Sequence, residues 1–499
     1  MRKSGVCTVI LSSIVIACLY ATGRAADHCR PAAGDPDGLF SRNLEVMSNR
    51  GYPLKKRRIA VIGSGISGLS AAWLLSQNHD VCLYEADWRI GGHANTVVCH
   101  EPEGDVAVDT GFIVYNERAY PNLVALFDYL DVPTAATEMG FAVSLDGGHI
   151  EYAGRGLAQI IGASRNLFDP EHWRMLLGIA RFFRTALRRA ENLADDVSLA
   201  KFLSAEGYGP AFIERHLLPM AGAIWSSAPE QMLNYPARSF VRFFDNHGLL
   251  RFRNRPKWRT VAGGSREYVR RLLDDGQFRT AMGQPVERVL RQPSHVTITC
   301  AGGERQDYDH VVIATHADQA LTLLADATPD ERELLSAFGY TMNRAILHRD
   351  SRLMPKRRRL WSGWNYIGAA GAQLCAITYW MNALQPLATT TDYFVSLNPA
   401  VEPEAALVLK TFDYAHPIFD ARALAAQRHL WDLQGQKNTW YCGAYFGSGF
   451  HEDGLQSGLA VAEALGGAMR PWFVPDPSSR IFTKPFDHLH AAPYAEAAE

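Results

Sequence analysis

The sequence predicts an α/β protein in which a dinucleotide-binding domain is assembled from separate stretches of the chain, beside a second domain of mixed β-sheet and helices. Three observations support this prediction. A strand, a glycine-rich turn and a helix follow one another from residue 58, strand-forming runs return near residue 285, and hairpin and helical patterns lie between them. With 499 residues, of which 47% are hydrophobic and 20% charged, the chain is long enough for more than one domain.

The composition excludes several classes of partner and site. A formal net charge of −2 at pH 7 argues against general attraction to nucleic acid, so no nucleic-acid partner is expected. The eight cysteines contain no CxxC pair, and those beyond residue 30 are widely scattered. This pattern indicates buried small side chains in a reducing compartment, and we expect neither a disulfide framework nor a metal site.

The first 26 residues have the three-part layout of an export signal: Arg2 and Lys3, an apolar run over Val6–Tyr20, and small residues after it. The run ends in a sequence similar to a lipoprotein-processing box, which would tether the protein by Cys18. Residues 27–56 have no visible periodicity and are expected to be a linker. An alternative is a start near Met47, which would make the protein cytoplasmic or inner-membrane-associated rather than exported or lipid-anchored.

The first glycine-rich turn carries the strongest signal in the sequence. We expect a strand over 59–62, a turn over 63–65, a helix over 66–77 and a strand over 81–84. In a Rossmann-like site the first glycine permits the tight turn, the second lets the backbone approach a pyrophosphate, and the third lets helix and strand pack closely. An acid about twenty residues later accepts hydrogen bonds from a ribose with free hydroxyls. The predicted cofactor contacts here are Gly63, Ser64, Gly65, Ser67, Gly68, Glu85 and Ala86.

A second glycine pair follows the acid, in Arg89-Ile90-Gly91-Gly92-His93. With it the sequence resembles the flavin amine oxidase superfamily, which includes monoamine oxidase, protoporphyrinogen oxidase and phytoene desaturase and binds FAD with an R-x-G-G-R/K motif. The resemblance implies FAD as the cofactor, with Gly91, Gly92 and His93 against it. His93 replaces the usual basic residue, so one hydrogen bond can be kept while the permanent charge is lost.

The resemblance also implies further cofactor contacts and a division of the chain. A predicted strand over Val106–Asn116 would run beside the flavin ring, and a helix beginning at Asp453 would direct its N-terminus at the flavin, with Asp453 capping that helix. The implied contacts are Thr110, Gly111, Phe112, Val286, Ala314, Thr315, Asp453, Gly454 and Leu455. We expect an FAD-binding domain over residues 57–115, 260–330 and 438–470, a substrate domain over 116–259 and 331–437, and a C-terminal tail over 471–499.

Several later stretches, among them "LWSGWNY", "TYWMNALQPL" and "FDYAHPIFD", look similar to a bacterial family of predicted NAD/FAD-binding, amine-oxidase-like proteins, over about residues 57–467. Some members are linked with modification of membrane fatty acyl chains. The resemblance implies an FAD-dependent oxidoreductase that transfers a hydride from a lipophilic substrate, such as a fatty acyl chain, to flavin N5 by dehydrogenation or isomerisation. The alternatives are an amine oxidase that produces hydrogen peroxide and a non-catalytic flavin electron carrier. The electron acceptor is unknown.

The substrate pocket is expected to be apolar and aromatic, with a few polar groups. Its candidates are Trp361, Trp364, Asn365, Tyr366, Trp380 and Asn382. The alternative interpretation is that these side chains form a packed sheet core, because aromatic residues favour strands. Candidate catalytic residues are Tyr379, Tyr414, His416 and His451. His451 is followed by two acids, but three adjacent residues would need an irregular backbone to converge on a metal.

Three basic stretches suggest contact with a membrane surface. The first is a predicted helix within residues 166–192 whose arginines lie at helical spacing, and the others cover residues 238–259 and 355–359. Either the helix packs on the core as an ordinary amphipathic helix, or it rests on an anionic membrane.

Overall fold

The computed structural model describes residues 56–154, 156–251, 255–368 and 376–485. The predicted export signal and the linker up to residue 55 lie outside the described residues. From Arg58 onward the described chain belongs to one compact unit, and the predicted domain boundaries within it stay predictions.

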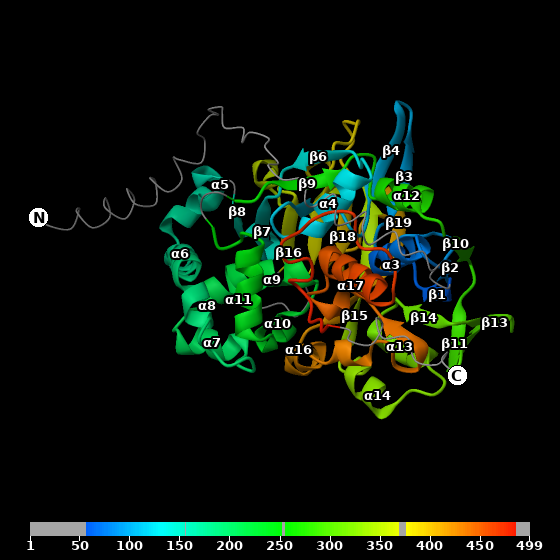
Figure 1. Cartoon of the computed structure of the whole chain (residues 1–499). Helices are drawn as coiled ribbons and strands as arrows, with labels where there is room; N and C mark the ends of the chain where they lie inside the picture. The colour runs from blue at the N-terminus through cyan, green and yellow to red at the C-terminus, as the bar shows by residue number, and fades with distance from the viewer. Residues whose placement is uncertain (1–55, 155, 252–254, 369–375, 486–499) are drawn as a thin grey trace, which may run out of the picture. The chain divides into compact units, whose positions relative to one another are not determined.

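A five-stranded parallel sheet forms the centre of the dinucleotide-binding part (Figure 1). Its strand order is β10-β2-β1-β14-β20, so its strands come from three separate stretches of the chain, which confirms the predicted fold class. The strands are β1 (Arg58–Ile62), β2 (Asp80–Glu85), β10 (Arg279–Met282), β14 (His310–Ile313) and β20 (Thr439–Tyr441).

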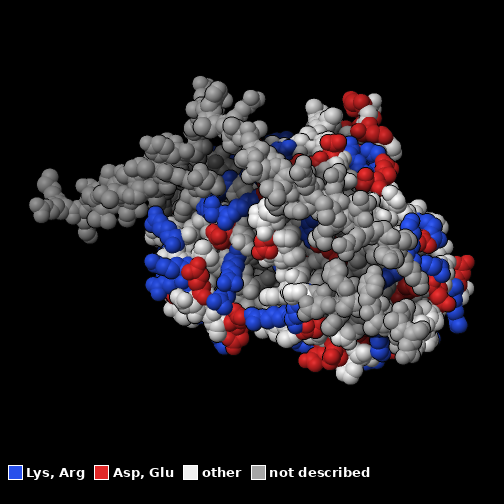
Figure 2. Space-filling view, viewed as in Figure 1, with Lys and Arg blue, Asp and Glu red and all other residues white. Residues whose placement is uncertain are grey.

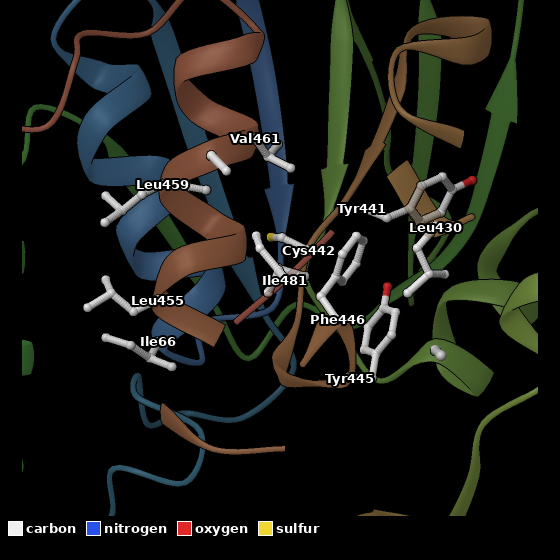
Figure 3. Close-up of a cluster of buried hydrophobic side chains, with 14 of the residues drawn as sticks. Ile66, Leu430, Tyr441, Cys442, Tyr445, Phe446, Leu455, Leu459, Val461 and Ile481 are labelled. Carbon is white, nitrogen blue, oxygen red and sulfur yellow. The ribbon is translucent and has the colours of Figure 1, made fainter. Parts of the chain in front are cut away.

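Two helices pack side by side against this sheet, although their sequences are almost 400 residues apart (Figure 1). They are α3 (Ile66–Ser76) and α17 (His451–Ala464). Every residue of α3 is buried, which explains why its apolar residues show no one-sided helical pattern. The close approach depends on Gly458, where an added Cβ would lie 2.2 Å from the Ser67 carbonyl oxygen. Figure 3 shows Leu455 of α17 beside Ile66 of α3.

A seven-stranded sheet forms a second layer, in the order β19-β15-β18-β17-β16-β7-β8. All neighbours are antiparallel except β16 and β7. The strands are β7 (Phe141–Leu145), β8 (Ile150–Ala153), β15 (Gly339–His348), β16 (Trp364–Gly368), β17 (Ile377–Trp380), β18 (Phe394–Leu397) and β19 (Val408–Ile418). One hairpin of the kind expected between the first glycine turn and residue 285 is formed by β7 and β8.

Smaller sheets connect these layers. They contain β3 (Thr96–Glu101) with β4 (Gly104–Asp109), β11 (Val286–Arg291) with β12 (Val296–Cys300) and β13 (Arg305–Tyr308), and β9 (Trp258–Val261) between β5 (Tyr115–Asn116) and β6 (Thr134–Thr137). The predicted single strand over Val106–Asn116 was wrong, because the chain leaves β4 after Asp109. The backbone N–H of Thr110 and of Phe112 then donates to carbonyls of the loop that carries His93.

Helices cover the remaining surface. Between residues 121 and 246 they are α4 (Pro121–Tyr129), α5 (Leu157–Ile161), α6 (Pro170–Ala190), α7 (Leu199–Ala205), α8 (Pro210–Phe212), α9 (Leu218–Trp225), α10 (Pro229–Asn234) and α11 (Ala237–Asn246). The others are α12 (Arg266–Asp275), α13 (Ala317–Leu323), α14 (Pro329–Leu335), α15 (Met381–Leu384) and α16 (Ala421–Gln427). Within the described ranges, no helix has both the length and the apolar character needed to cross a bilayer.

The segment after α17 packs against the rest of the molecule. Arg480 makes a buried ion pair with Asp453 at 2.6 Å, and its guanidinium also donates to the Ala119 carbonyl. Trp472 stacks on Trp73 of α3, with ring centroids 5.9 Å apart. The first part of the predicted C-terminal tail therefore holds α17 in place.

The four cysteines in the described residues are all free and buried. This confirms, for these four, the expectation of small buried side chains without a disulfide framework.

Candidate functional site

The first glycine turn leaves a bare, positively polarised helix end. Gly63 has φ +100°, and a Cβ there would lie 2.9 Å from the Ala314 carbonyl oxygen, so only glycine fits. A Cβ on Gly68 would lie 1.9 Å from the Gly63 carbonyl oxygen. In front of Gly65, by contrast, nothing lies within 4 Å of a built Cβ, and this N-cap residue of α3 provides no side-chain cap. The free N–H groups and the space before them fit a pyrophosphate.

Glu85 lies beside this turn at the end of β2. Its carboxylate accepts hydrogen bonds from the backbone N–H of Ser64 at 3.0 Å and from the Ser64 hydroxyl. The acid is therefore adjacent to the phosphate-binding turn, at the carboxyl edge of the sheet where a ribose would lie.

The second glycine pair packs directly against the first turn. Gly91 and Gly92 both have positive φ, at +123° and +57°, and a Cβ on Gly92 would lie 3.0 Å from Gly65 Cα. The Gly91 N–H donates to the Ser64 carbonyl. Arg89 donates to the Gly92 and Ala94 carbonyls, so it holds the loop in shape through its own backbone.

His93 lies at the centre of a group of rings. Its ring centroid is 4.9 Å from that of Tyr414, 5.6 Å from that of His416 and 6.4 Å from that of His316. Its Nε2 atom is buried and has no hydrogen-bond partner among the described residues. Burial, followed by the neighbouring histidines, lowers the pKa of His93 well below its usual value, so the ring is neutral. The permanent charge of the usual motif is thus lost here.

Tyr414 and His416 project from the same face of β19, two residues apart. Asn95 donates to the Tyr414 hydroxyl at 2.9 Å, and the same hydroxyl is 2.9 Å from the Thr110 hydroxyl. Asn343 donates to His416 Nδ1 at 2.8 Å, which places the His416 proton on Nε2. Burial lowers the pKa of His416 to about 4, so this imidazole is also neutral.

His316 completes the group from the loop before α13. It stacks on Tyr340, with centroids 4.5 Å apart and an interplanar angle of 16°. Burial lowers the pKa of His316 and raises that of Tyr340. His93, His316 and His416 with Tyr340 and Tyr414 are called the histidine cluster below.

His451 is placed differently from the other catalytic candidates. Its ring stacks on Phe112 at a centroid distance of 3.8 Å, and its Nε2 lies 2.9 Å from the Tyr268 hydroxyl. Burial lowers its pKa to about 3. The ring face of His451 therefore contacts Phe112 while its Nε2 contacts Tyr268, so the side chain connects the Phe112 loop to α12.

The two acids after His451 point in other directions. Glu452 accepts from the backbone N–H groups of Asn122 and Leu123 and so caps α4. Asp453 accepts from the Phe450 N–H at 2.7 Å, as the predicted helix cap, and pairs with Arg480. The helix begins at His451, two residues before the predicted start. No group of three metal-ligating side chains occurs among the residues that the structure describes.

The other predicted cofactor contacts gather around the same turn. Ser64 and Ser67 lie at the start of α3, Ala86 follows β2, and Gly111 packs on the His93 carbonyl oxygen, 2.2 Å from a built Cβ. Ala314 and Thr315 follow β14 beside Gly63, while Gly454 and Leu455 contact the first residue of α3. Val286 begins β11. Their contacts with FAD stay predictions.

The predicted substrate pocket is not assembled as one site. The buried Asn365 side chain forms hydrogen bonds with the backbone of Ser362 and Thr378. The Asn382 side chain forms hydrogen bonds with the backbone of Thr391 and Tyr393. The indole N–H of Trp361 donates to the Pro355 carbonyl, and that of Trp380 donates to the Asp392 carboxylate. Tyr366 and the partly buried Trp364 belong to the hydrophobic core around β7 and β16.

Tyr379 lies on β17, three strands away from Tyr414 and His416 on β19, and its ring packs perpendicular to Trp364. The structure brings two catalytic candidates, Tyr414 and His416, to His93 and leaves Tyr379 elsewhere. It also adds His316, Tyr340 and Asn343. None of them belongs to a local motif that would have marked it in the sequence.

The parallel sheet, the paired glycine turns and the uncapped start of α3 define a flavin-dependent oxidoreductase. Over residues 66–383 the chain matches the family model described as "Flavin containing amine oxidoreductase", and it belongs to this family. This match confirms the superfamily, the cofactor and the enzyme class that were predicted from the sequence. The protein is a flavin-dependent oxidoreductase, and FAD is its cofactor. No curated protein matches the sequence.

Several solved structures share the fold. A fatty acid isomerase from P. acnes, described as CLA-producing, has a TM-score of 0.60 at 16% identity, covering 83% of this chain and 98% of its own. Putrescine oxidase bound to putrescine gives 0.58 at 15% identity, with coverage of 82% and 99%. Cyclohexylamine oxidase from Brevibacterium oxydans IH-35A gives 0.56 at 17% identity, also with 82% and 99%. At these identities the likeness establishes the fold.

Proposed function

We propose that this enzyme removes a hydride from a lipophilic substrate of the fatty acyl class, by dehydrogenation or isomerisation. The observation that carries the proposal is the neutral character of the histidine cluster. The three histidine pKa values are lowered, and the two tyrosine pKa values are raised. Neutral side chains suit an alkyl chain, and none of the five members of the histidine cluster is a carboxylate that could pair with an ammonium group.

A hydrophobic core next to the histidine cluster supports the same substrate class. Tyr414 belongs to a hydrophobic core that joins the β3–β4 hairpin to the seven-stranded sheet, with members such as Val108, Ile113 and Leu347. A solved structure described as a fatty acid isomerase also shares this fold.

An amine substrate would favour two facing aromatic rings around the carbon that is oxidised. Tyr414 and Trp380, two aromatic candidates from the sequence, do not form such a pair, because they lie on strands β19 and β17 and in separate hydrophobic clusters. Tyr414 instead faces His93 at 4.9 Å and Phe412 at 6.0 Å. Because two amine oxidases share the fold, amines are included among the candidate substrates in the experiment below.

Bound FAD supplies the hydride acceptor at N5. When a carbon–carbon double bond is formed, the substrate also loses one proton, whereas isomerisation returns the hydride to another carbon of the same chain. His93 Nε2 is buried and has no partner among the described residues, so it can contact the cofactor or the substrate, whereas the lowered pKa of the ring disfavours uptake of the proton there. Asn343 fixes the ring of His416 beside it.

The test is anaerobic incubation of the purified yellow protein with fatty acids, phospholipids and a panel of amines. The proposal predicts that only acyl substrates bleach the flavin or return with a moved double bond. Bleaching by amines alone, with hydrogen peroxide on admission of air, would contradict it. The Gly65→Asp variant, with a carboxylate at the phosphate site, should purify colourless and serve as the control for flavin dependence.

A further inference from the structure

An exposed stripe of arginines runs along α6. Arg174, Arg181, Arg184 and Arg188 are exposed at spacings of three, four and seven residues, which places them on one side of the helix together with Leu177. The opposite side packs on the core through Met175, Phe182, Ala186 and Ala190. The stripe is about 21 Å long at 1.5 Å per residue. Figure 2 shows lysine and arginine side chains gathered where α6, α8 and α11 lie.

Exposed apolar side chains accompany the stripe. Leu177 lies within it and is 55% exposed, while Leu167 and Phe168, in the turn before α6, are 43% and 87% exposed. This turn is well held, because the Trp173 indole donates to the Leu167 carbonyl and Asp169 caps α6 and pairs with Arg215. The structure therefore holds these side chains in water at a defined place, at a cost in hydrophobic free energy.

Several arginines of the other two basic stretches have partners within the molecule. Arg357 pairs with Glu151, Arg358 pairs with Asp392, and Arg359 donates to the Gly162 carbonyl. Arg238 pairs with Asp195.

The α6 stripe keeps more of its charge available. Arg174 and Arg181 pair with acids at the surface, but Arg184 and Arg188 form no ion pair with any described residue. Exposed surface pairs contribute little, about 0–1 kcal/mol, so the pair with Glu171 does not hold Arg174 away from another anion. Arg181 is held more firmly, because it also donates to the Glu206 carbonyl and lies over the Tyr208 ring.

We propose that α6 and the turn before it, Leu167–Arg188, dock on the surface of an anionic phospholipid bilayer. Each arginine near such a surface is attracted to the lipid headgroups, and Phe168 with Leu177 can enter the boundary between headgroups and acyl chains. A nucleic acid would attract the arginines equally but would gain little from an exposed aliphatic side chain. Membrane docking is independent of the proposed function, because vesicle binding can be measured without any substrate turnover.

The experiment is flotation of the full-length, flavin-loaded protein with phosphatidylcholine vesicles, with and without phosphatidylglycerol. The parent should float with the anionic vesicles only, and Arg184→Glu/Arg188→Glu should bind them at least about tenfold more weakly. Phe168→Ser/Leu177→Ser, which keeps the charge, should also bind more weakly. The matched control is Arg305→Glu/Arg332→Glu, which changes the net charge equally on exposed residues of β13 and α14 and should float like the parent.

Hydrogen–deuterium exchange provides a local readout, with protection of residues 164–190 expected on addition of anionic vesicles. Equal binding by the parent and the α6 variants, equal binding to neutral vesicles, or no protection of these residues would overturn the proposal. Tighter binding to single-stranded DNA than to anionic vesicles would overturn it in favour of nucleic acid. Flavin content that is unchanged in all variants separates these outcomes from a failure of the oxidoreductase site.

Discussion

At the scale of single residues, the three adjacent side chains at the start of α17 have three separate structural tasks. His451 supports the Phe112 loop, Glu452 caps α4, and Asp453 caps its own helix while it pairs with Arg480. A histidine beside two acids is often a sign of acid–base or metal chemistry. Here each partner lies inside the protein, so the stretch acts as a support for the cofactor site.

His451→Phe tests this structural role. Phenylalanine keeps the stack on Phe112 but leaves the buried Tyr268 hydroxyl without its partner, so the free energy of unfolding should fall by about 1–3 kcal/mol. Chemical denaturation of the apoprotein measures this change. Turnover per bound flavin should stay within a few fold of the parent. A large fall in turnover with an unchanged fold would instead make His451 a catalytic residue.

The sequence identified the glycines, Glu85 and His93 because these residues belong to one local motif. It also singled out Tyr414 and His416, but it could not show that they face His93, which is more than 300 residues earlier in the chain. His316 and Asn343 were missed for the same reason. Such contacts depend on how the long strand β19 is aligned with the parallel sheet, and no local pattern encodes that alignment.

At the scale of elements, the contact between the β1–α3 turn and its neighbours depends on missing side chains. Gly63, Gly68 and Gly458 each leave a gap that a backbone atom fills, whereas the gap at Gly65 faces open space. The two kinds of glycine have different roles, one in folding and one in cofactor binding.

Gly68→Ala and Gly65→Ala separate these roles. The new Cβ at Gly68 meets a carbonyl oxygen, so the free energy of unfolding of the apoprotein should fall by about 2–3 kcal/mol. At Gly65 the backbone is extended and the space is open, so the change should be only about 0.5–1 kcal/mol, the usual cost of alanine at an N-cap, while FAD occupancy falls. Urea unfolding and flavin content measure the two effects. Full FAD occupancy in Gly65→Ala, or an apoprotein as stable as the parent in Gly68→Ala, would refute the assignment.

The segment after α17 can be tested through its buried ion pair. Arg480→Met leaves Asp453 without its partner at a site where the carboxylate is fully buried, so the free energy of unfolding should fall by about 3–5 kcal/mol. Adding Asp453→Asn should restore part of this loss, because the amide oxygen can still accept from the Phe450 N–H. A double variant that is no more stable than Arg480→Met would show that the pair is not the cause.

Most elements around the first glycine turn could be predicted, because apolar runs and glycines mark their ends. The expected strand over 59–62 and helix over 66–77 differ from β1 and α3 by one residue each. The break after Asp109 could not be predicted, since the partners of Thr110 and Phe112 are carbonyls of a distant loop. The packing of the aromatic stretches in the sheet core was one of the two interpretations offered.

At the scale of the whole molecule, several buried histidines are kept neutral by the folded state. Burial lowers their pKa values to about 3 or 4 at His216, His247, His348, His416 and His451. In the unfolded chain these groups have a pKa near 6.5, so the unfolded state binds more protons between about pH 6.5 and 4.

The free energy of unfolding should therefore fall as the pH decreases through this window, by about 1 kcal/mol for each such histidine between pH 6.5 and 5.5. Asp109 opposes the trend in part, because burial raises its pKa to about 6. Urea unfolding at a series of pH values measures the slope, and His451→Phe should reduce it. Stability that is constant or rises toward pH 5.5 would show that these rings are not buried as described.

The most direct test of the central claim follows the hydrogen atoms of the substrate. The flavin-loaded protein is incubated without oxygen with a phospholipid whose acyl chains are deuterated, and the lipid is analysed by mass spectrometry. We predict that deuterium leaves the chain as a double bond forms, or moves along it as a double bond shifts, and that colourless Gly65→Asp does neither. Unchanged lipid in the presence of fully loaded flavin, with turnover of amines instead, would contradict the account.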